Sequence, residues 1–129
     1  MATIFSKIVS GEIPCYKIAE NDEFLAFLDI QPLVKGHTLV IPKIEIDYIF
    51  DIDDALLGRY INFSKDVAKK MKRVLECKKI GMTVIGLEVP HAHIHLMPIN
   101  GIADMDFNQP KLNLAASEME IIAKMIREA

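Results

Sequence analysis

The chain has 129 residues, of which 51% are hydrophobic and 26% charged, a size and composition typical of one globular domain (residues 1–129). Its net charge of −3 argues against a general attraction to nucleic acid. No apolar run approaches the roughly 18 residues that a membrane span needs, and Ser6 and Lys7 interrupt the first apolar stretch as no signal peptide would. Because Cys15 and Cys77 form no CxxC pair, we expect a reduced, cytoplasmic protein.

The N-terminal third is expected to form a short helix and a β-hairpin. Apolar side chains recur at helical spacing over residues 4–9, with Thr3 a suitable N-cap residue and Gly11 ending the helix. Strand-like runs follow at residues 16–19 and 24–28, and the turn chemistry between them favours a hairpin.

A third strand is expected over residues 37–41, after a loop. Leu39 and Ile41 share a face with His37 if this segment is extended. The histidine then lies at one end of an apolar row, which is an unusual place for it unless it faces a cleft.

The remaining elements complete an α+β pattern. Apolar residues recur at three- and four-residue steps over residues 53–75, which predicts the longest helix, and its lysines are more typical of a solvated face than of a nucleic-acid patch. A strand is expected at residues 82–85. Ser117 could cap a final helix that ends at Arg127, with an apolar face of Met119, Ile122, Met125 and Ile126. This order of elements predicts a mostly antiparallel sheet.

Three of the four histidines fall within five positions, at residues 91, 93 and 95. They alternate with Ala92, Ile94 and Leu96, and a period of two indicates a β-strand, here expected over residues 91–98. One face of that strand would carry three imidazoles, and the other face would pack into the core.

Two chemistries suit such a row of imidazoles. Three histidines and a water form a known catalytic zinc site, although Glu88 is the only acidic residue nearby in the sequence. Alternatively, a neutral imidazole can attack phosphorus when its other nitrogen donates to a carbonyl oxygen, while its neighbours orient or protonate the phosphate. The spacing alone leaves both hypotheses open.

The motif His-x-His-x-His followed by two apolar residues resembles the signature of the histidine-triad (HIT) superfamily of nucleotide hydrolases and transferases. Residues 4–8, 11–14, 26–32 and 36–43 resemble the same family, in family order. The resemblance covers about residues 4–98, whereas residues 99–129 match no family tail that we can place. It is strongest to the branch that acts on nucleoside phosphoramidates and related adenylated compounds.

The resemblance implies a HIT-like fold, with an antiparallel sheet of about five strands, one long helix and shorter terminal helices, and a homodimer. It implies that His93 is the nucleophile, that His95 and His37 form its hydrogen-bonded surroundings, and that His91 helps to hold it. Asp29 would accept hydrogen bonds from the ribose hydroxyls. The base pocket would be lined by five residues that are otherwise typical of a core: Ile4, Phe5, Ile8, Phe27 and Ile30.

The sequence departs from the family at the zinc ligands. Zinc-bearing members have cysteines where this chain has Thr3 and Ser6, and a histidine where it has Glu45. We therefore expect no structural zinc and no other cofactor.

A second departure precedes the triad, where the family has a longer glycine-rich segment beside the α-phosphate. Here Leu87 replaces a polar amide, Glu88 stands where a hydroxyl residue is expected, and Val89 follows beside the nucleotide. A carboxylate near an anionic phosphate should repel it unless it turns away or is protonated.

The function implied is a nucleotidyl hydrolase or transferase for a purine nucleotide. Attack by His93 on the α-phosphate would expel an amine or a phosphate-bearing group, and water would then release the nucleoside monophosphate. The alternatives are a nucleotide-binding protein without catalysis and a metal-dependent hydrolase.

Overall fold

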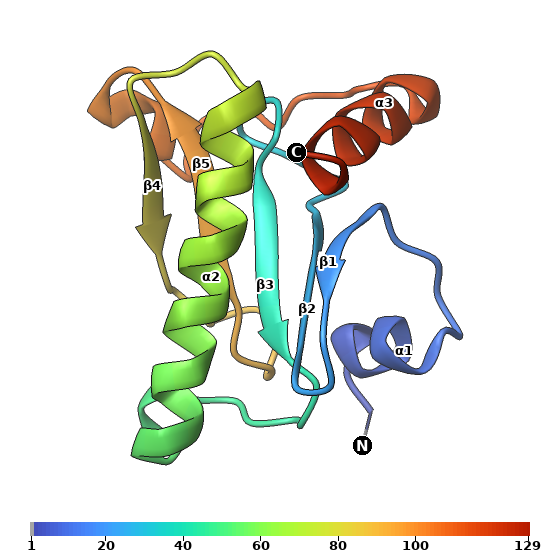
Figure 1. The fold of residues 1–129 in the computed structure, drawn as a ribbon, viewed down its shortest axis with the longest axis vertical. Helices are drawn as coiled ribbons and strands as arrows, with labels where there is room; N and C mark the ends of the chain where they lie inside the picture. Colours follow the sequence, from blue (N-terminus) through green and yellow to red (C-terminus); the bar gives the residue numbers. More distant parts are fainter. Residues whose placement is uncertain (1) are drawn as a thin grey trace.

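The computed structural model describes residues 2–129 as a five-stranded antiparallel sheet with helices packed against it (Figure 1). The strands are hydrogen-bonded in the order β1-β2-β3-β5-β4. The elements are α1 (Ile4–Ser10), β1 (Lys17–Glu20), β2 (Phe24–Leu28), β3 (Thr38–Pro42), α2 (Asp54–Val74), β4 (Lys79–Thr83), β5 (Ile94–Ile99) and α3 (Ala116–Arg127), with 3₁₀ turns at Ile49–Asp51 and Ile102–Met105.

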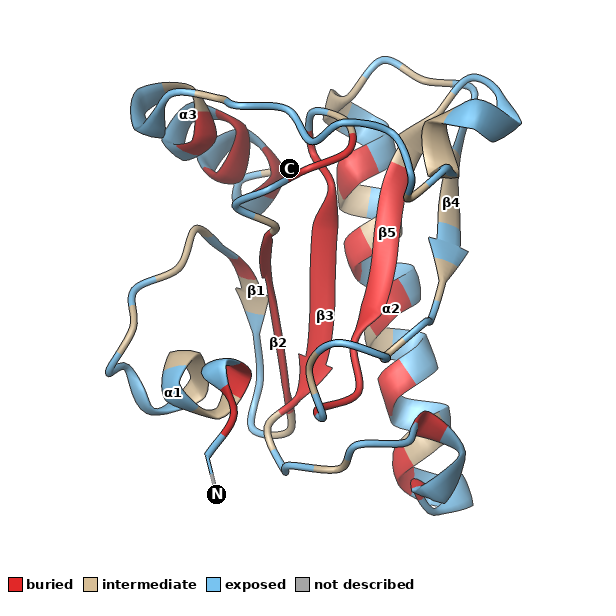
Figure 2. Cartoon of the chain, turned by 180° about the vertical axis from the view of Figure 1, so that it is seen from behind, coloured by how far each residue is buried: buried red, intermediate tan, exposed pale blue. Residues whose placement is uncertain are grey.

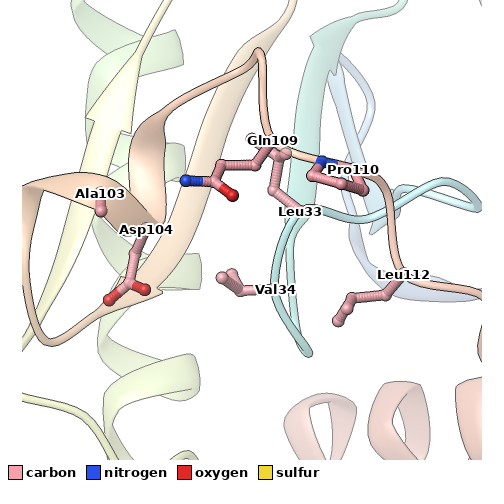
Figure 3. Close-up of a pocket in the computed structure, with 7 residues that line it drawn as sticks. All are labelled: Leu33, Val34, Ala103, Asp104, Gln109, Pro110 and Leu112. Carbon is pink, nitrogen blue, oxygen red and sulfur yellow. The ribbon is translucent and has the colours of Figure 1, made fainter.

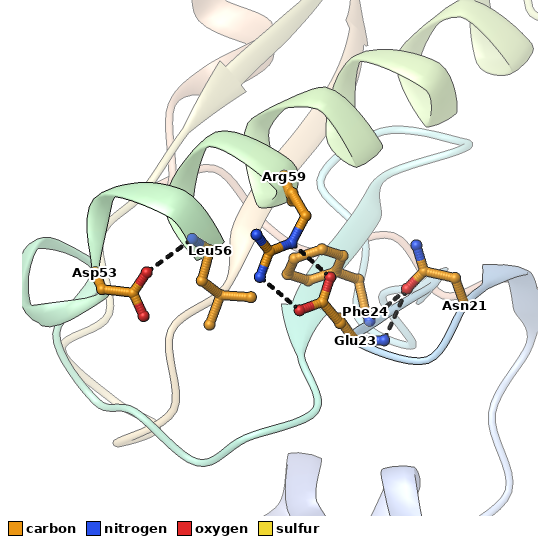
Figure 4. A network of polar contacts seen from close by, with 6 residues as sticks. All are labelled: Asn21, Glu23, Phe24, Asp53, Leu56 and Arg59. Atoms are coloured by element: carbon orange, nitrogen blue, oxygen red, sulfur yellow. Dashed lines mark hydrogen bonds and ion pairs between the residues drawn. The ribbon is translucent and has the colours of Figure 1, made fainter.

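Local signals define the N-terminal elements as the sequence predicts. The Thr3 hydroxyl oxygen accepts a hydrogen bond from the Ser6 amide at 3.0 Å and caps α1. Gly11 ends the helix with a φ of 86°, a left-handed conformation that glycine adopts without strain. In the β1–β2 hairpin, the Asn21 side-chain oxygen accepts from the Phe24 amide at 2.8 Å (Figure 4).

Helix α2 is joined to the hairpin at its N-terminal end. Asp53 caps the helix by accepting from the Leu56 amide at 2.9 Å. One turn later, the Arg59 guanidinium donates two hydrogen bonds to the Glu23 carboxylate, at 2.8 and 2.9 Å (Figure 4). Both side chains of this pair are exposed, so it contributes little to the free energy of unfolding.

The main core lies between the sheet and the helices α2 and α3, which cover the same face (Figure 1). Alternate strand residues such as Ala26, Val40 and Ile94 point to this face and are buried. Tyr60 of α2 is fully buried there, and its hydroxyl donates to the Val40 carbonyl at 2.5 Å. Burial of the phenol raises the pKa of Tyr60 above its usual value.

The opposite face carries a smaller apolar cluster at the end nearest α1. Phe5 of α1 packs there on Leu25 and Phe27 of β2 and on Leu39 and Ile41 of β3. Figure 2, which looks onto this face, shows β2, β3 and β5 buried along most of their length. The sheet is therefore covered on both sides, although α1 is short.

Three sequence predictions differ from the structure. The strand predicted at residues 82–85 is displaced to Lys79–Thr83, because pairing with β5 ends where Thr83 meets His95. The strand predicted over residues 91–98 begins only at Ile94. The last helix begins at Ala116 with Ala115 as its N-cap, so Ser117 is not the cap.

The outer face of α3 also differs from its prediction. Met125, which was expected on the apolar face, is 41% exposed, whereas Ala123 is fully buried in its place. The helix begins at Ala116, one residue before Ser117, and Met119, Ile122 and Ile126 still lie on the core face.

Within residues 2–129, no helix is both long enough and apolar enough to cross a membrane.

Candidate active site

Four imidazoles lie together on the face of the sheet that faces away from α2. Ala92, Ile94 and Leu96 point into the main core, so the histidines that alternate with them point to the other face, although only His95 lies within β5. The ring centroids of His93 and His95 are 5.0 Å apart, and those of His95 and His37 are 5.2 Å apart. All four side chains are at least 92% buried: His37, His91, His93 and His95.

His93 has the hydrogen bond that a nucleophilic imidazole requires. Its Nδ1 lies 2.8 Å from the backbone carbonyl oxygen of His91. Because a carbonyl only accepts, Nδ1 carries the proton and Nε2 keeps its lone pair. The Nε2 nitrogen is therefore the atom able to attack an electrophile.

The tautomers of His37 and His95 follow from a chain of hydrogen bonds. The Leu33 amide donates to Nδ1 of His37 at 3.1 Å, so His37 carries its proton on Nε2. That proton is donated to Nδ1 of His95 at 2.9 Å, which leaves the His95 proton on Nε2. His95 thus offers an N–H donor at the position beside His93.

Both of these imidazoles are neutral at pH 7. Burial lowers the pKa of His37 to about 3, and the neighbouring His95 and Lys111 add to the effect. Burial likewise lowers the pKa of His95 to about 4, with a contribution from His93.

His91 is held by a polar cluster that reaches the N-terminus of α1. Its Nε2 donates to the Pro42 carbonyl at 2.8 Å, so the Thr3 hydroxyl donates to Nδ1, at 3.0 Å. Glu45 accepts from the Thr3 amide at 3.0 Å and from the Ser6 hydroxyl. Hydrogen bonds to Ser6 and Thr3 lower the pKa of the Glu45 carboxyl.

This cluster occupies the positions at which zinc-bearing relatives are expected to hold their metal. Two hydroxyls, an exposed carboxylate and one imidazole are not the cysteine and histidine ligands of a structural zinc site. In addition, both ring nitrogens of His91 already have hydrogen-bond partners. The residues present do not fit the metal.

A second group with metal-ligand chemistry consists of Asp29, His37 and His95, whose ligand atoms lie within 4.8 Å of one another. Here the His37 Nε2 carries a proton that it donates to His95, so neither of the two facing nitrogens is free to bind an ion. Leu33, His37 and His95 therefore form a chain of hydrogen bonds and not a set of metal ligands.

Asp29 follows β2 and borders the imidazoles. One carboxylate oxygen lies 3.7 Å from Nε2 of His37, and the other accepts from the Gln31 amide at 2.9 Å. Burial raises the pKa of this carboxyl above its usual value, while the Gln31 amide and Lys111 oppose the rise. A partly exposed acceptor is therefore available beside the triad.

The five residues expected in a base pocket separate into two groups. Phe5 and Phe27 are buried edge-to-face at 5.8 Å, Ile8 packs against them, and the Phe5 ring lies 5.0 Å from His93. Ile4 and Ile30 are instead 47% and 71% exposed.

The segment before the triad is mostly exposed. Leu87 is 88% exposed and Glu88 is also exposed, while Val89 packs against the Phe5 cluster. The Glu88 side chain can therefore turn toward solvent.

Two residues from the divergent tail also reach the site, and no sequence motif identified them. The Phe107 ring lies edge-on to His95 at 4.9 Å and to His37 at 6.2 Å. The Lys111 ammonium lies 5.3 Å from the centre of the Phe107 ring. The sequence shows only one aromatic and one basic residue in the loop before α3, and this combination is too common to predict a site.

A family model described as the HIT domain matches residues 10–101. An uncharacterized HIT-like protein of Borreliella burgdorferi is 35% identical over 131 residues, covering 95% of this chain and 94% of the relative. An adenosine 5′-monophosphoramidase of Saccharomyces cerevisiae is 40% identical over 98 residues, covering 75% of this chain and 62% of the yeast protein.

Solved structures agree with these relatives. The crystal structure of a HIT-like protein from Bartonella henselae, described as involved in cell-cycle regulation, superimposes with a TM-score of 0.83 at 30% identity, covering 98% of this chain and 95% of that one. The chain therefore belongs to the HIT family, and its α+β fold is the fold of that family.

Proposed function

We propose that the protein is a metal-independent nucleotidyl hydrolase or transferase that acts at the α-phosphate of a purine nucleotide through a covalent intermediate on His93. The observation that carries this proposal is the 2.8 Å contact between Nδ1 of His93 and the His91 carbonyl, which directs the lone pair of Nε2 away from the backbone. The yeast relative named as an adenosine 5′-monophosphoramidase supports the substrate class.

In the first step, Nε2 of His93 forms a bond to the α-phosphorus while the bond to the leaving nitrogen or oxygen breaks. The leaving group takes its proton from solvent water, and the neutral His95 donates a hydrogen bond to it from Nε2–H without losing that proton. The resulting nucleotidyl-imidazolium keeps its Nδ1–H on the His91 carbonyl, which stabilises the positive charge.

In the second step, water attacks phosphorus and the bond to Nε2 breaks. The attacking water loses its proton to solvent, the nucleoside monophosphate leaves, and His93 regains its Nε2 lone pair while Nδ1 keeps its proton. Asp29 would hold the ribose hydroxyls, and the cluster around Phe5 and Phe27 would receive the base.

We also propose that the protein works without zinc and as a homodimer. The hydrogen bonds of His91 to Thr3 and Pro42 replace a metal in fixing that ring. β4 is an edge strand, and Met82, Val84 and Ile85 are exposed in or just after it. Light scattering at micromolar concentration gives the oligomeric state directly.

The test of catalysis is the release of AMP from adenosine 5′-phosphoramidate with a chelator present, for the parent protein and His93→Ala. Turnover that persists in chelator and falls at least about a thousandfold in the variant is the expected result. Loss of the parental activity on chelation would instead favour a metal-dependent hydrolase. Binding of AMP by calorimetry without any turnover would favour a binding protein.

A further inference from the structure

The segment Asp106–Leu112, which lies outside the region that the HIT model matches, is fixed against the site by its own hydrogen bonds. The Leu112 amide donates to the Pro32 carbonyl at 2.8 Å, which ties the segment to the loop between β2 and β3. At its other end, Asp106 accepts from the amides of Asn108 and Gln109, at 2.9 and 3.1 Å. These hydrogen bonds fix the Asp106–Leu112 segment at both of its ends.

The Asp106–Leu112 segment lies beside the loop between β2 and β3, and Leu33 of this loop fixes the tautomer of His37. A cavity of about 270 Å³ lies between the segment and this loop. Figure 3 shows Gln109, Pro110 and Leu112 of the segment beside Leu33 and Val34, which help to line it. It is the amide of the same Leu33 that donates to Nδ1 of His37. The position of the segment is thereby coupled to the triad.

The imidazoles have an aromatic ring at each end of their row, from opposite parts of the chain. Phe5 contacts His91 and His93, whereas Phe107 contacts His95 and His37. Lys111 lies over the Phe107 ring, so its cation is held at this second end.

A cation suits this site, because the neutral His37 and His95 and the carboxylate of Asp29 border the place proposed for an anionic phosphate. The charge of Lys111 lowers the pKa values of Asp29, His37 and His95. Among the described residues 2–129, no other lysine or arginine affects all three groups. The Lys111 side chain is exposed, and its flexible four-carbon stem lets the ammonium move toward a bound phosphate.

We propose that Lys111 is a specificity-determining residue that attracts the charge of a phosphorylated leaving group, so that the site favours phosphoanhydride-linked nucleotides over phosphoramidates. This inference rests on the proposed function, because it assigns the class of leaving group at the same site. Phe107 is a positioning residue that holds the ammonium beside the triad.

The experiment compares kcat/KM for diadenosine tetraphosphate and adenosine 5′-phosphoramidate in the parent, Lys111→Gln, Lys111→Arg and Lys65→Gln. Lys65 is exposed on α2, which covers the other face, so its variant removes the same charge far from the site. Lys111→Gln should lower the ratio of the two kcat/KM values about three- to tenfold at low salt, and less at high salt. Lys111→Arg should preserve that ratio, and Lys65→Gln should leave it unchanged.

An equal loss on both substrates would overturn the proposal, because it would show a structural role. A ratio no different from that of Lys65→Gln would overturn it as well. If the parent turns over neither substrate, the proposed catalysis fails, but Lys111 can still be tested by calorimetry. Lys111→Gln should then weaken ADP binding more than AMP binding, and equal weakening would contradict the assignment.

Discussion

The two faces of the sheet bury side chains of opposite character. Toward α2 and α3 the sheet presents an apolar core, in which Tyr60 and Ser64 donate to backbone carbonyls. Away from them it buries four imidazoles, whose ring nitrogens make hydrogen bonds to one another, to Thr3 and to the backbone. Alternate residues of one strand point to opposite faces of the sheet. One face can therefore stabilise the fold through an apolar core, while the other face holds the imidazoles of the candidate site.

The imidazole face avoids the usual cost of buried polar groups by satisfying them. Among the residues that the structure describes, every buried side-chain nitrogen and oxygen has a hydrogen-bond partner. His37 and His95 are also neutral at pH 7, because burial lowers their pKa values, so the larger cost of burying a charge is avoided there.

The largest contrast is expected between His93→Ala and Met71→Ala, which remove buried side chains from opposite faces. Met71 is fully buried in the main core, so its truncation should lower the free energy of unfolding by about 2–5 kcal/mol. The folded Met71→Ala protein should keep its kcat, whereas His93→Ala should lose activity with a smaller change in stability. Urea denaturation and AMP release measure the two effects. A Met71→Ala protein that is folded but as inactive as His93→Ala would show that the two faces are not separable.

The next effect is a dependence of stability on pH that comes from the imidazole face. The pKa of His37 is lowered to about 3 and that of His95 to about 4, from an unfolded value of 6.5. The unfolded chain binds more protons than the folded chain between these values, so stability is full above about pH 6.5 and falls as the pH falls toward 3.

Denaturation midpoints measured between pH 7 and pH 4 check this expectation. His95→Asn, which cannot titrate, should give a shallower fall with acid than the parent. An identical slope in the two proteins would mean that His95 is not the group responsible.

The smallest effect is expected at Thr3, which joins α1 to His91. Thr3→Val keeps the shape of the side chain but removes both the N-cap and the donor to Nδ1 of His91. The free energy of unfolding should fall by about 1 kcal/mol. If His91 also orients the carbonyl that holds His93, kcat should fall while KM is unchanged.

Thr3→Ser is the matched control, because it keeps the hydroxyl and should restore kcat. If valine and serine give the same kcat, Thr3 is a helix cap with no positioning role.

Strong local patterns made most of the fold predictable. Thr3 and Gly11 bound α1 as expected, the turn at Asn21 forms the hairpin, and Asp53 caps α2. Local patterns did not predict the bounds of a strand that are set by its pairing with a neighbouring strand. The pattern at residues 82–85 predicts a strand, but β5 pairs with Lys79–Thr83 instead and leaves Val84 and Ile85 exposed.

The site could be predicted only where its residues form a motif. The four histidines and Asp29 were named from the sequence, and the structure brings them together, while their roles remain predictions. Phe107 and Lys111 could not be found, because their place depends on how the tail folds back onto the loop at Pro32. The exposure of Ile4 and Ile30 could not be predicted either, because it depends on the angle of α1 for Ile4 and on the path of the loop after β2 for Ile30.

The central claim is that His93 carries the nucleotide as a covalent intermediate, and the most direct test is the stereochemistry at phosphorus. A substrate with a chiral α-thiophosphate, hydrolysed in isotopically labelled water, reports whether one or two displacements occur. Two in-line displacements, one by His93 and one by water, predict overall retention of configuration. Inversion would show that water attacks the substrate directly, and would contradict the account.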